Sequence, residues 1–180
     1  MLSTSPRATR IASLRALLVM VVVLVLDQLT KHLLESSLRQ GSESRLLPGL
    51  ALVNTRNHGI AFGVQPGGLA VMSVVIGLAL LALLLYFLRH ATSPLIWLPT
   101  GLIFGGAIGN IIDRAREGAV TDFIKLPLGW PPFNLADASI TVGIVILILL
   151  VGREDSRRRK ESPDVGAADA AVGRPDRGSV

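Results

Sequence analysis

Four aspartates stand at or near the ends of long apolar segments of the chain, namely Asp27, Asp113, Asp122 and Asp137. A carboxylate close to lipid is costly, so it needs a partner or a function. Two carboxylates that meet in a poorly hydrated place cannot both ionise comfortably, and the pair then shares one proton. That state suits an aspartic protease, in which the ionised carboxylate activates water while the protonated one hydrogen-bonds the scissile carbonyl. No Ser-His or Ser-Lys arrangement competes convincingly with this chemistry.

Each of these acids, taken alone, also has a structural explanation. Asp27 and Lys31 are spaced i,i+4, so they can form an ion pair on one helix face. Asp113 can anchor a helix end at the interface together with Arg114, because arginine snorkels readily. Asp122 can be a carboxylate that caps a loop. Asp137 can be an acid in the first turn of a helix, where the helix dipole favours a negative charge. Several membrane acids that meet on one face nevertheless mark a site, so their convergence favours function.

The composition indicates a membrane protein. Half of the 180 residues are apolar, 17% are charged, and the mean hydropathy is +0.55. The net charge of +5 comes from basic residues at the ends of apolar segments, a pattern typical of membrane topology and not of nucleic-acid binding. There is no cysteine, and His32, His58 and His90 lack the spacing of metal ligands. We therefore expect no metal and no other cofactor.

Four apolar segments are candidates for membrane-crossing helices, since about 20 apolar residues span the hydrocarbon core. They are residues 14–34, 67–88, 95–112 and 135–151. The first is not followed by a small-residue cleavage site, so it is predicted to be retained and not to be a cleaved signal peptide. The predicted fold class is an all-α integral membrane protein of four transmembrane helices, with a small extracytoplasmic β-sheet between the first two.

The distribution of Lys and Arg predicts the orientation. Eleven of the 18 lie before the first span or at its N-terminal end (Arg15), between the second and third spans, or after the fourth. Both termini are therefore expected in the cytoplasm. Asp27 is then about 18 Å along the helix from Arg15, toward the extracytoplasmic side. The predicted divisions are a cytoplasmic segment 1–13, a four-span domain 14–152, and a disordered basic tail 153–180.

The third span carries two stripes of small or polar residues. Gly101, Gly105 and Gly109 repeat every four residues, so this face lets another backbone come close. Asn110 and Asp113 lie on the adjacent stripe, which should press them into the helix bundle and away from lipid.

The connection after the first span predicts the small sheet. Residues 50–53 and 60–64 have the composition of short strands around a polar turn that contains Asn54 and Asn57. Gly59 permits close approach of another strand or of an extended peptide. Extended substrates are often held by adding a strand to such an edge.

Five segments, in order, resemble the type II signal peptidases, which are bacterial lipoprotein signal peptidases. They are DQLTK (27–31), RNHGIAFG (56–63), GGAIGNIIDR (105–114), VTDFI (120–124) and FNLADASI (133–140). The resemblance implies an aspartic endopeptidase of the bacterial cytoplasmic membrane. Such an enzyme cuts diacylglyceryl-modified prolipoproteins before the lipidated cysteine and is the target of globomycin-type antibiotics.

The resemblance also implies roles for individual residues. The catalytic dyad falls on Asp122 and Asp137. Residues that support the dyad or the substrate fall on Asp27, Lys31, Asn57, Gly59, Asn110, Asp113, Arg114 and Asn134. One chain supplies both carboxylates, so a monomer should suffice.

Two other functions remain open at this point. An ion-coupled transporter also uses membrane acids, although it usually places them at the midplane between internal repeats. A metal-dependent transferase would use the acids as Mg²⁺ ligands, but Arg114 and Lys125 would oppose a cation. Proton-coupled flux and chelator sensitivity would reveal these two alternatives.

Overall fold

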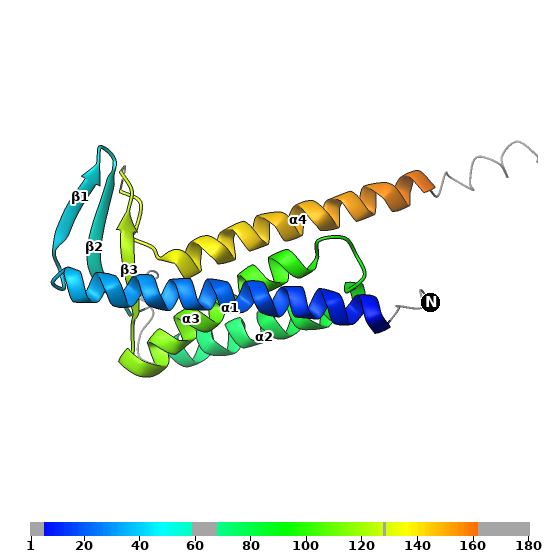
Figure 1. The fold of residues 1–180 in the computed structure, drawn as a ribbon, viewed down its shortest axis with the longest axis horizontal. Helices are drawn as coiled ribbons and strands as arrows, with labels where there is room; N and C mark the ends of the chain where they lie inside the picture. The colour runs from blue at the N-terminus through cyan, green and yellow to red at the C-terminus, as the bar shows by residue number, and fades with distance from the viewer. Residues whose placement is uncertain (1–5, 59–67, 128, 162–180) are drawn as a thin grey trace, which may run out of the picture. The chain divides into compact units, whose positions relative to one another are not determined.

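The structure is a computed structural model that describes residues 6–58, 68–127 and 129–161 (Figure 1). Four helices and three strands occupy this part of the chain. In order they are α1 (Pro6–Ser37), β1 (Glu43–Leu47), β2 (Leu50–Asn57), α2 (Gly68–His90), α3 (Trp97–Glu117), β3 (Val120–Lys125) and α4 (Leu135–Glu161). The strands lie together beside the ends of α1 and α3 and the start of α4 (Figure 1).

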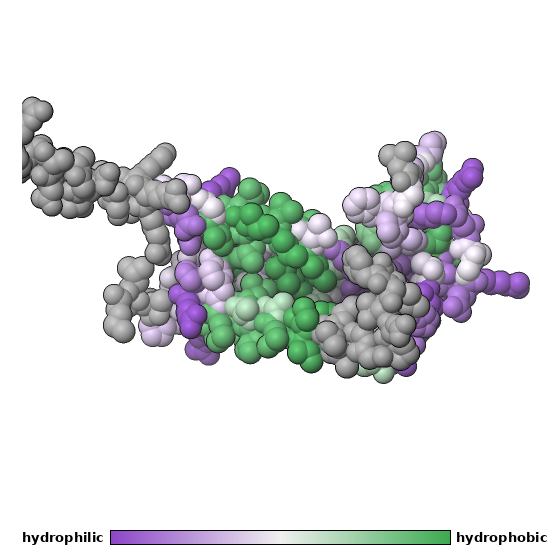
Figure 2. Space-filling view, turned by 180° about the vertical axis from the view of Figure 1, so that it is seen from behind, coloured by the Kyte–Doolittle hydropathy of each residue, from purple (hydrophilic) through white to green (hydrophobic). Residues whose placement is uncertain are grey.

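The four predicted spans all coincide with helices, although the helices are longer than the apolar segments. Among the described residues, two helical segments are long and apolar enough to cross a membrane, Pro6–Ser37 and Leu135–Ser156, and Val74–His90 is a shorter apolar helix. In α3 the apolar pattern is interrupted by the glycines, Asn110 and Asp113. Hydrophobic side chains gather over the helices and hydrophilic ones over the sheet in Figure 2.

The glycine stripe of α3 packs against α1, as predicted. A β-carbon at Gly101 would lie 2.6 Å from the Ala16 carbonyl oxygen, and one at Gly105 would lie 2.8 Å from that of Met20. A β-carbon at Gly109 would lie 2.6 Å from a carboxylate oxygen of Asp27. The missing side chains therefore allow the two helix backbones to approach closely, and they bring Asp27 against α3.

The adjacent stripe of α3 packs against α4. A β-carbon at Gly106 would lie 2.4 Å from the Ala136 carbonyl oxygen and 2.5 Å from Ser139 Oγ. On the other helix, a β-carbon at Gly143 of α4 would lie 2.7 Å from the side chain of Ile103 of α3. This contact holds the first turn of α4, including Asp137, beside Asn110.

The sheet is antiparallel in the order β1-β2-β3. A two-residue Pro48-Gly49 turn joins β1 to β2, and the φ of +87° at Gly49 is one that glycine adopts without strain. Two of the sheet's strands lie in the connection between the first two spans, as predicted, and the third comes from the connection between α3 and α4, which the prediction did not include. Thr55 of β2 pairs with Asp122 of β3.

Two further expectations about the strands need correction. Asn54 and Asn57 lie within β2 and not in a turn, and Asp122 lies in a strand and not in a loop. Hydrogen bonds from Asn54 Nδ2 to the Leu38 carbonyl and from Asn57 Nδ2 to Asp122 offset the low strand propensity of asparagine. Gly59 and the predicted strand 60–64 lie outside the described residues.

The chain divides into two compact units, residues 1–147 and 148–180. Helix α4 is continuous through Glu161, so residues 153–161 are helical and not disordered as predicted. Arg, Lys and Glu are good helix formers, and the apolar part of α4 supplies the costly nucleus. Residues 162–180 of the predicted tail lie outside the described residues.

The close approach at Gly106 predicts the effect of a single methyl group. Gly106→Ala should lower the stability of the detergent-solubilised protein by on the order of 1–3 kcal/mol, because the Ala136 carbonyl must move. Thermal unfolding followed by tryptophan fluorescence would measure the loss. Gly77→Ala in α2 is the matched control, since a β-carbon there meets nothing within 4 Å. Equal stability of the two variants would contradict this packing.

Candidate active site

The N-terminus of α4 positions Asp137 through a reciprocal cap. The Asp137 backbone N–H donates to Asn134 Oδ1 at 2.9 Å, and the Asn134 backbone N–H donates to Asp137 Oδ2 at 3.2 Å. This capping box satisfies two N–H groups that the helix itself leaves unpaired. It also turns the amide nitrogen of Asn134 away from α4.

Asn134 connects the two carboxylates. Its Nδ2 donates to Asp122 Oδ1 at 2.7 Å, while its backbone holds Asp137. Asn134 is completely buried, Asp122 is 2% exposed, and Asp137 is half-buried. One side chain therefore joins β3 to α4 and brings into one site two acids that are fifteen residues apart in the sequence.

Two further asparagines complete the shell around the pair. Asn57 Nδ2 of β2 donates to Asp122 Oδ2 at 2.9 Å, and Asn110 Nδ2 of α3 donates to Asp137 Oδ1 at 2.8 Å. Each of the four carboxylate oxygens thus accepts one N–H. These neutral donors orient both groups without adding the positive charge that would keep both ionised.

Burial, and to a smaller extent the negative charge of Asp137, raise the pKa of Asp122 from its ordinary 3.8 to about 6. Hydrogen bonds from Asn57 and Asn134 act in the opposite direction. Because the folded state binds this proton more tightly than the unfolded chain, Asp122 lowers stability as pH rises from about 4 to 6. Above pH 6 this contribution no longer changes with pH.

A buried lysine lies behind the pair. Lys31 Nζ is 2.7 Å from Asp27 Oδ2, as the i,i+4 spacing predicted, and 2.7 Å from Asp113 Oδ2. It also donates to Asn110 Oδ1 at 3.1 Å. Since an ammonium can only donate, Lys31 fixes which end of the Asn110 amide is the oxygen and leaves the nitrogen for Asp137.

The two acids bound to Lys31 also hold the elements that carry the pair. Asp27 Oδ1 accepts the backbone N–H of Ala136, in the first turn of α4, at 2.9 Å. Asp113 accepts Gln28 Nε2 at 2.8 Å and the backbone N–H of Thr121, in β3, at 3.4 Å. Neither Asp27 nor Asp113 makes a hydrogen bond to Asp122 or Asp137 among the contacts of the described residues.

The residues predicted for the site thus fall into two layers. Asn57, Asn110 and Asn134 contact the carboxylate pair directly, and the second layer consists of Asp27, Lys31 and Asp113. Arg114 donates to the Asn110 backbone carbonyl at 3.3 Å and so lies on the edge of the site.

Sequence reasoning missed an ionic cluster between the sheet and the helix ends. Arg56 of β2 pairs with Glu35 of α1 at 3.2 Å and with Glu117 of α3. Thr121 Oγ1 donates to the same Glu35 oxygen at 2.5 Å. Arg56 lies beside Asn57 and pairs in register with Thr121, which precedes Asp122. Gln28 was missed as well, although both Gln28 and Arg56 lie inside segments singled out in the sequence.

Comparison with known proteins identifies the family. The sequence model described as Signal peptidase (SPase) II matches residues 19–152. The chain belongs to the signal peptidase II family. This is a family of membrane proteases, and the matched region contains both aspartates of the pair and the whole of the second layer.

Individual relatives agree. The lipoprotein signal peptidase of Syntrophomonas wolfei is 44% identical over 140 residues, covering 76% of this chain and 93% of the relative. That of Halothermothrix orenii is 35% identical over 139 residues, covering 77% of this chain and 95% of the relative. That of Staphylococcus aureus is 30% identical over 151 residues, covering 81% and 93%.

Two solved structures, described as bacterial membrane enzymes, have a similar fold. The one at 1.9 Å resolution has a TM-score of 0.71 and 31% identity, covering 76% of this chain and 91% of that one. The one at 2.3 Å has a TM-score of 0.72 and 29% identity, covering 83% and 94%. The fold shared with these membrane enzymes therefore extends over most of the chain.

The charge of Asp137 should be visible in the titration of Asp122. In Asp137→Asn, the pKa of Asp122 should fall below about 6, because one of the causes that raise it is removed. Infrared or ¹³C NMR titration of labelled aspartate carboxyls would measure the change. Glu43→Gln, in the outer strand β1, is the control and should leave the titration where it is. An unchanged or raised pKa in Asp137→Asn would contradict the coupling.

Loss of the ionic cluster should misplace the pair without removing it. Arg56→Gln should lower kcat on the order of 10- to 100-fold, the scale of a displacement of about 1 Å at a reacting group. Steady-state cleavage kinetics would separate kcat from KM. The exposed Arg39→Gln is the control and should behave as the wild type. Wild-type kcat in Arg56→Gln would show that the cluster does not position the pair.

Proposed function

We propose that this chain is an aspartic endopeptidase that removes the signal peptide from diacylglyceryl-modified prolipoproteins. Cleavage would occur just before the lipidated cysteine. The observation that carries the proposal is the bridging of Asp122 and Asp137 by Asn134, with an N–H donor on every carboxylate oxygen. The names of the relatives supply the substrate class.

The proposed reaction uses water and one shared proton. Asp137 is half-buried, and it takes a proton from water as the oxygen attacks the scissile carbonyl. Asp122 is the more buried acid and carries the proton that is donated to the carbonyl oxygen. As the tetrahedral diol collapses, Asp122 takes back a proton from one of its hydroxyl groups, the C–N bond breaks, and Asp137 donates its proton to the leaving nitrogen. At the end of the cycle, Asp122 is protonated and Asp137 is ionised, as they were at the start.

Substrate binding supports this assignment of the proton. The pKa of Asp122 is already about 6 in the free enzyme because of burial. A peptide laid over the pair removes more water, which raises the pKa of a carboxyl further toward neutrality. The acid would then be protonated in the complex at the pH at which the enzyme works.

The proposed membrane placement follows from the helices and the charge pattern. All four helices span the membrane, both termini are cytoplasmic, and the pair lies near the extracytoplasmic face of the bacterial cytoplasmic membrane. Asp27 and Lys31 lie in the C-terminal half of α1, and the sheet begins beyond its end. A lipidated cysteine can remain in the bilayer there while its peptide reaches water.

The proposed substrate contacts involve the sheet and the edge of the pair. Asn57 and Gly59 would border the extended peptide, and Arg114 would support the site from α3. Globomycin-type inhibitors would occupy the same position over Asp122 and Asp137. One chain supplies every group in this account, so a monomer is sufficient.

The arrangement around Lys31 favours the protease over a Mg²⁺-dependent transferase. Its ammonium lies within 2.7 Å of both Asp27 and Asp113, the position that a cation bound between these acids would take. Such a cation would meet a fixed positive charge.

Single amide variants test the proposed dyad. Purified Asp122→Asn and Asp137→Asn should each lower the cleavage rate of a diacylglyceryl-modified prolipoprotein by at least about 10²–10⁴-fold, the range for loss of an acid or base. The wild type should keep its rate in excess chelator. Asp155→Asn, an exposed aspartate near the C-terminal end of α4, is the matched control. Near-normal turnover by either dyad variant, with the fold intact, would refute the assignment.

A further inference from the structure

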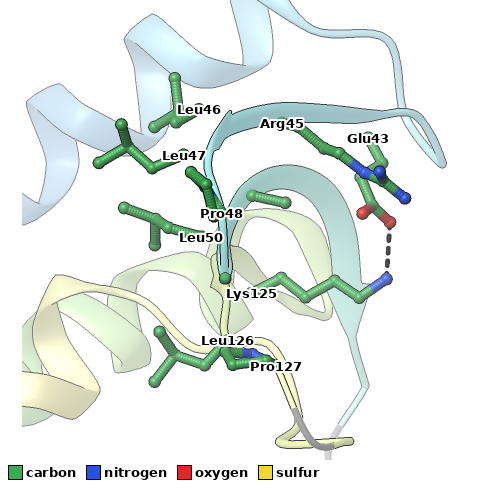
Figure 3. Close-up of a pocket in the computed structure, with 11 residues that line it drawn as sticks. Glu43, Arg45, Leu46, Leu47, Pro48, Leu50, Lys125, Leu126 and Pro127 are labelled. Atoms are coloured by element: carbon green, nitrogen blue, oxygen red, sulfur yellow. Dashed lines mark hydrogen bonds and ion pairs between the residues drawn. The ribbon is translucent and has the colours of Figure 1, made fainter.

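The outer end of the sheet exposes large apolar side chains in a part of the molecule that the proposed chemistry does not use. Leu46 and Leu47, at the end of β1, are 53% and 65% exposed, and Leu126, after β3, is also exposed. These residues and Leu50 line a cavity of about 630 Å³, which the charged Glu43, Arg45 and Lys125 also border (Figure 3). An exposed apolar cluster of this kind marks a contact surface.

A β-bulge gives this end of the sheet two different sides. Strict alternation along β1 would direct Leu46 and Leu47 to opposite faces, but the register shifts between Arg45 and Leu47. Figure 3 shows the leucines on one side, toward the helices, and Arg45 on the other side with the Glu43–Lys125 ion pair. The sheet end is therefore amphipathic, with the lining leucines Leu46, Leu47, Leu50 and Leu126 forming its apolar side.

The apolar side lies at the level where the membrane-facing surface of α1 ends. Thr121 of β3 donates to Glu35 of α1, which places the sheet beside that residue. Leu33, two residues earlier and about 3 Å along the helix, is 54% exposed. In the proposed membrane placement, this end of α1 reaches the lipid headgroups, and the sheet that lies beside it (Figure 1) is at the same depth.

The surface is also too far from the dyad to belong to it. Thr55 pairs with Asp122, whereas the apolar side lies at the Leu47–Leu50 pair. Five strand residues from Thr55 to Leu50 correspond to about 17 Å. A peptide bond at the carboxylates would not reach this surface within the same few residues.

We propose that the apolar side of the sheet end is a membrane anchor that enters the outer lipid leaflet beside the helix bundle. Elements with one apolar and one charged face lie in this interfacial layer. Trp130, which is 63% exposed in the connection between β3 and α4, has the amphipathic ring that favours the same depth. The anchor fixes the height of β2 and β3, and therefore of Asn57 and Asp122, relative to the bilayer. It rests on the membrane placement in the proposed function.

Spin labels test the anchor directly, because the full-length chain has no cysteine of its own. Leu47→Cys, Arg45→Cys and Leu18→Cys would each be labelled with a nitroxide and placed in lipid vesicles without substrate. Power-saturation EPR compares accessibility to oxygen, which partitions into lipid, with accessibility to a nickel chelate, which stays in water. All three positions are exposed, so the fold should tolerate the label, and melting temperatures would check this.

The label at position 47 should show an oxygen-to-nickel ratio roughly threefold or more above that at position 45, because only position 47 enters lipid. Equal nickel accessibility at 47 and 45, with position 18 in lipid, would overturn the anchor and leave the proposed function standing. That result would also be the one expected if the surface instead received an exported peptide. Nickel access at position 18 would overturn the membrane placement, and with it both proposals.

Discussion

The buried ammonium of Lys31 is the interaction on which the rest of the site depends. It is 4% exposed and binds two carboxylates, Asp27 and Asp113, together with the amide oxygen of Asn110. A charge so far from water is stable only with such partners, and removing one partner of a buried pair typically costs about 3–5 kcal/mol. The acids in turn accept N–H groups from α4 and β3. A single positive charge in α1 therefore holds the first turn of α4, the middle of α3 and the start of β3 in one place.

The asparagines connect this structural cluster to a carboxylate pair that can perform acid–base chemistry. Lys31 orients Asn110, Asn110 donates to Asp137, and Asn134 donates to Asp122. Lys31 thus touches the neutral amide of Asn110 and not the carboxylate pair itself, and its charge lowers the pKa of Asp122 less than the hydrogen bonds from Asn57 and Asn134 do. If Lys31 contacted the pair directly, it would favour ionisation of both acids and remove the shared proton that acid–base chemistry needs. The glycines of α3 make this geometry possible, since side chains at Gly106 and Gly109 would occupy the space that Ala136 and Asp27 now fill.

Local patterns in the sequence were enough to predict the helices and much of the second layer. The i,i+4 spacing of Asp27 and Lys31 and the four-residue repeat of glycines are periodicities of one helix, so they can be read without knowing the fold. The residue roles were read from the resemblance, and the predicted residues that the structure describes lie in the two layers around the pair.

What could not be predicted depends on contacts between distant segments. The strand that carries Asp122 is six residues long and pairs with residues more than 60 positions earlier, so no local periodicity reveals it. Asn57 is disfavoured in strands by propensity, and its hydrogen bond to Asp122 helps to offset that cost. The role of Arg56 depends on two glutamates at the ends of different helices. The helical start of the basic tail depends on its continuity with the apolar part of α4.

The central claim is that Asp122 and Asp137 act as one unit that shares a proton, and a double variant tests it most directly. The measurement is kcat/KM for cleavage of a lipid-modified prolipoprotein by Asp122→Asn, by Asp137→Asn and by the chain that carries both substitutions. If the two carboxylates are one unit, the double variant retains the rate of the slower single variant, within about threefold. If the losses multiply, each aspartate contributes independently, and the shared-proton account is wrong.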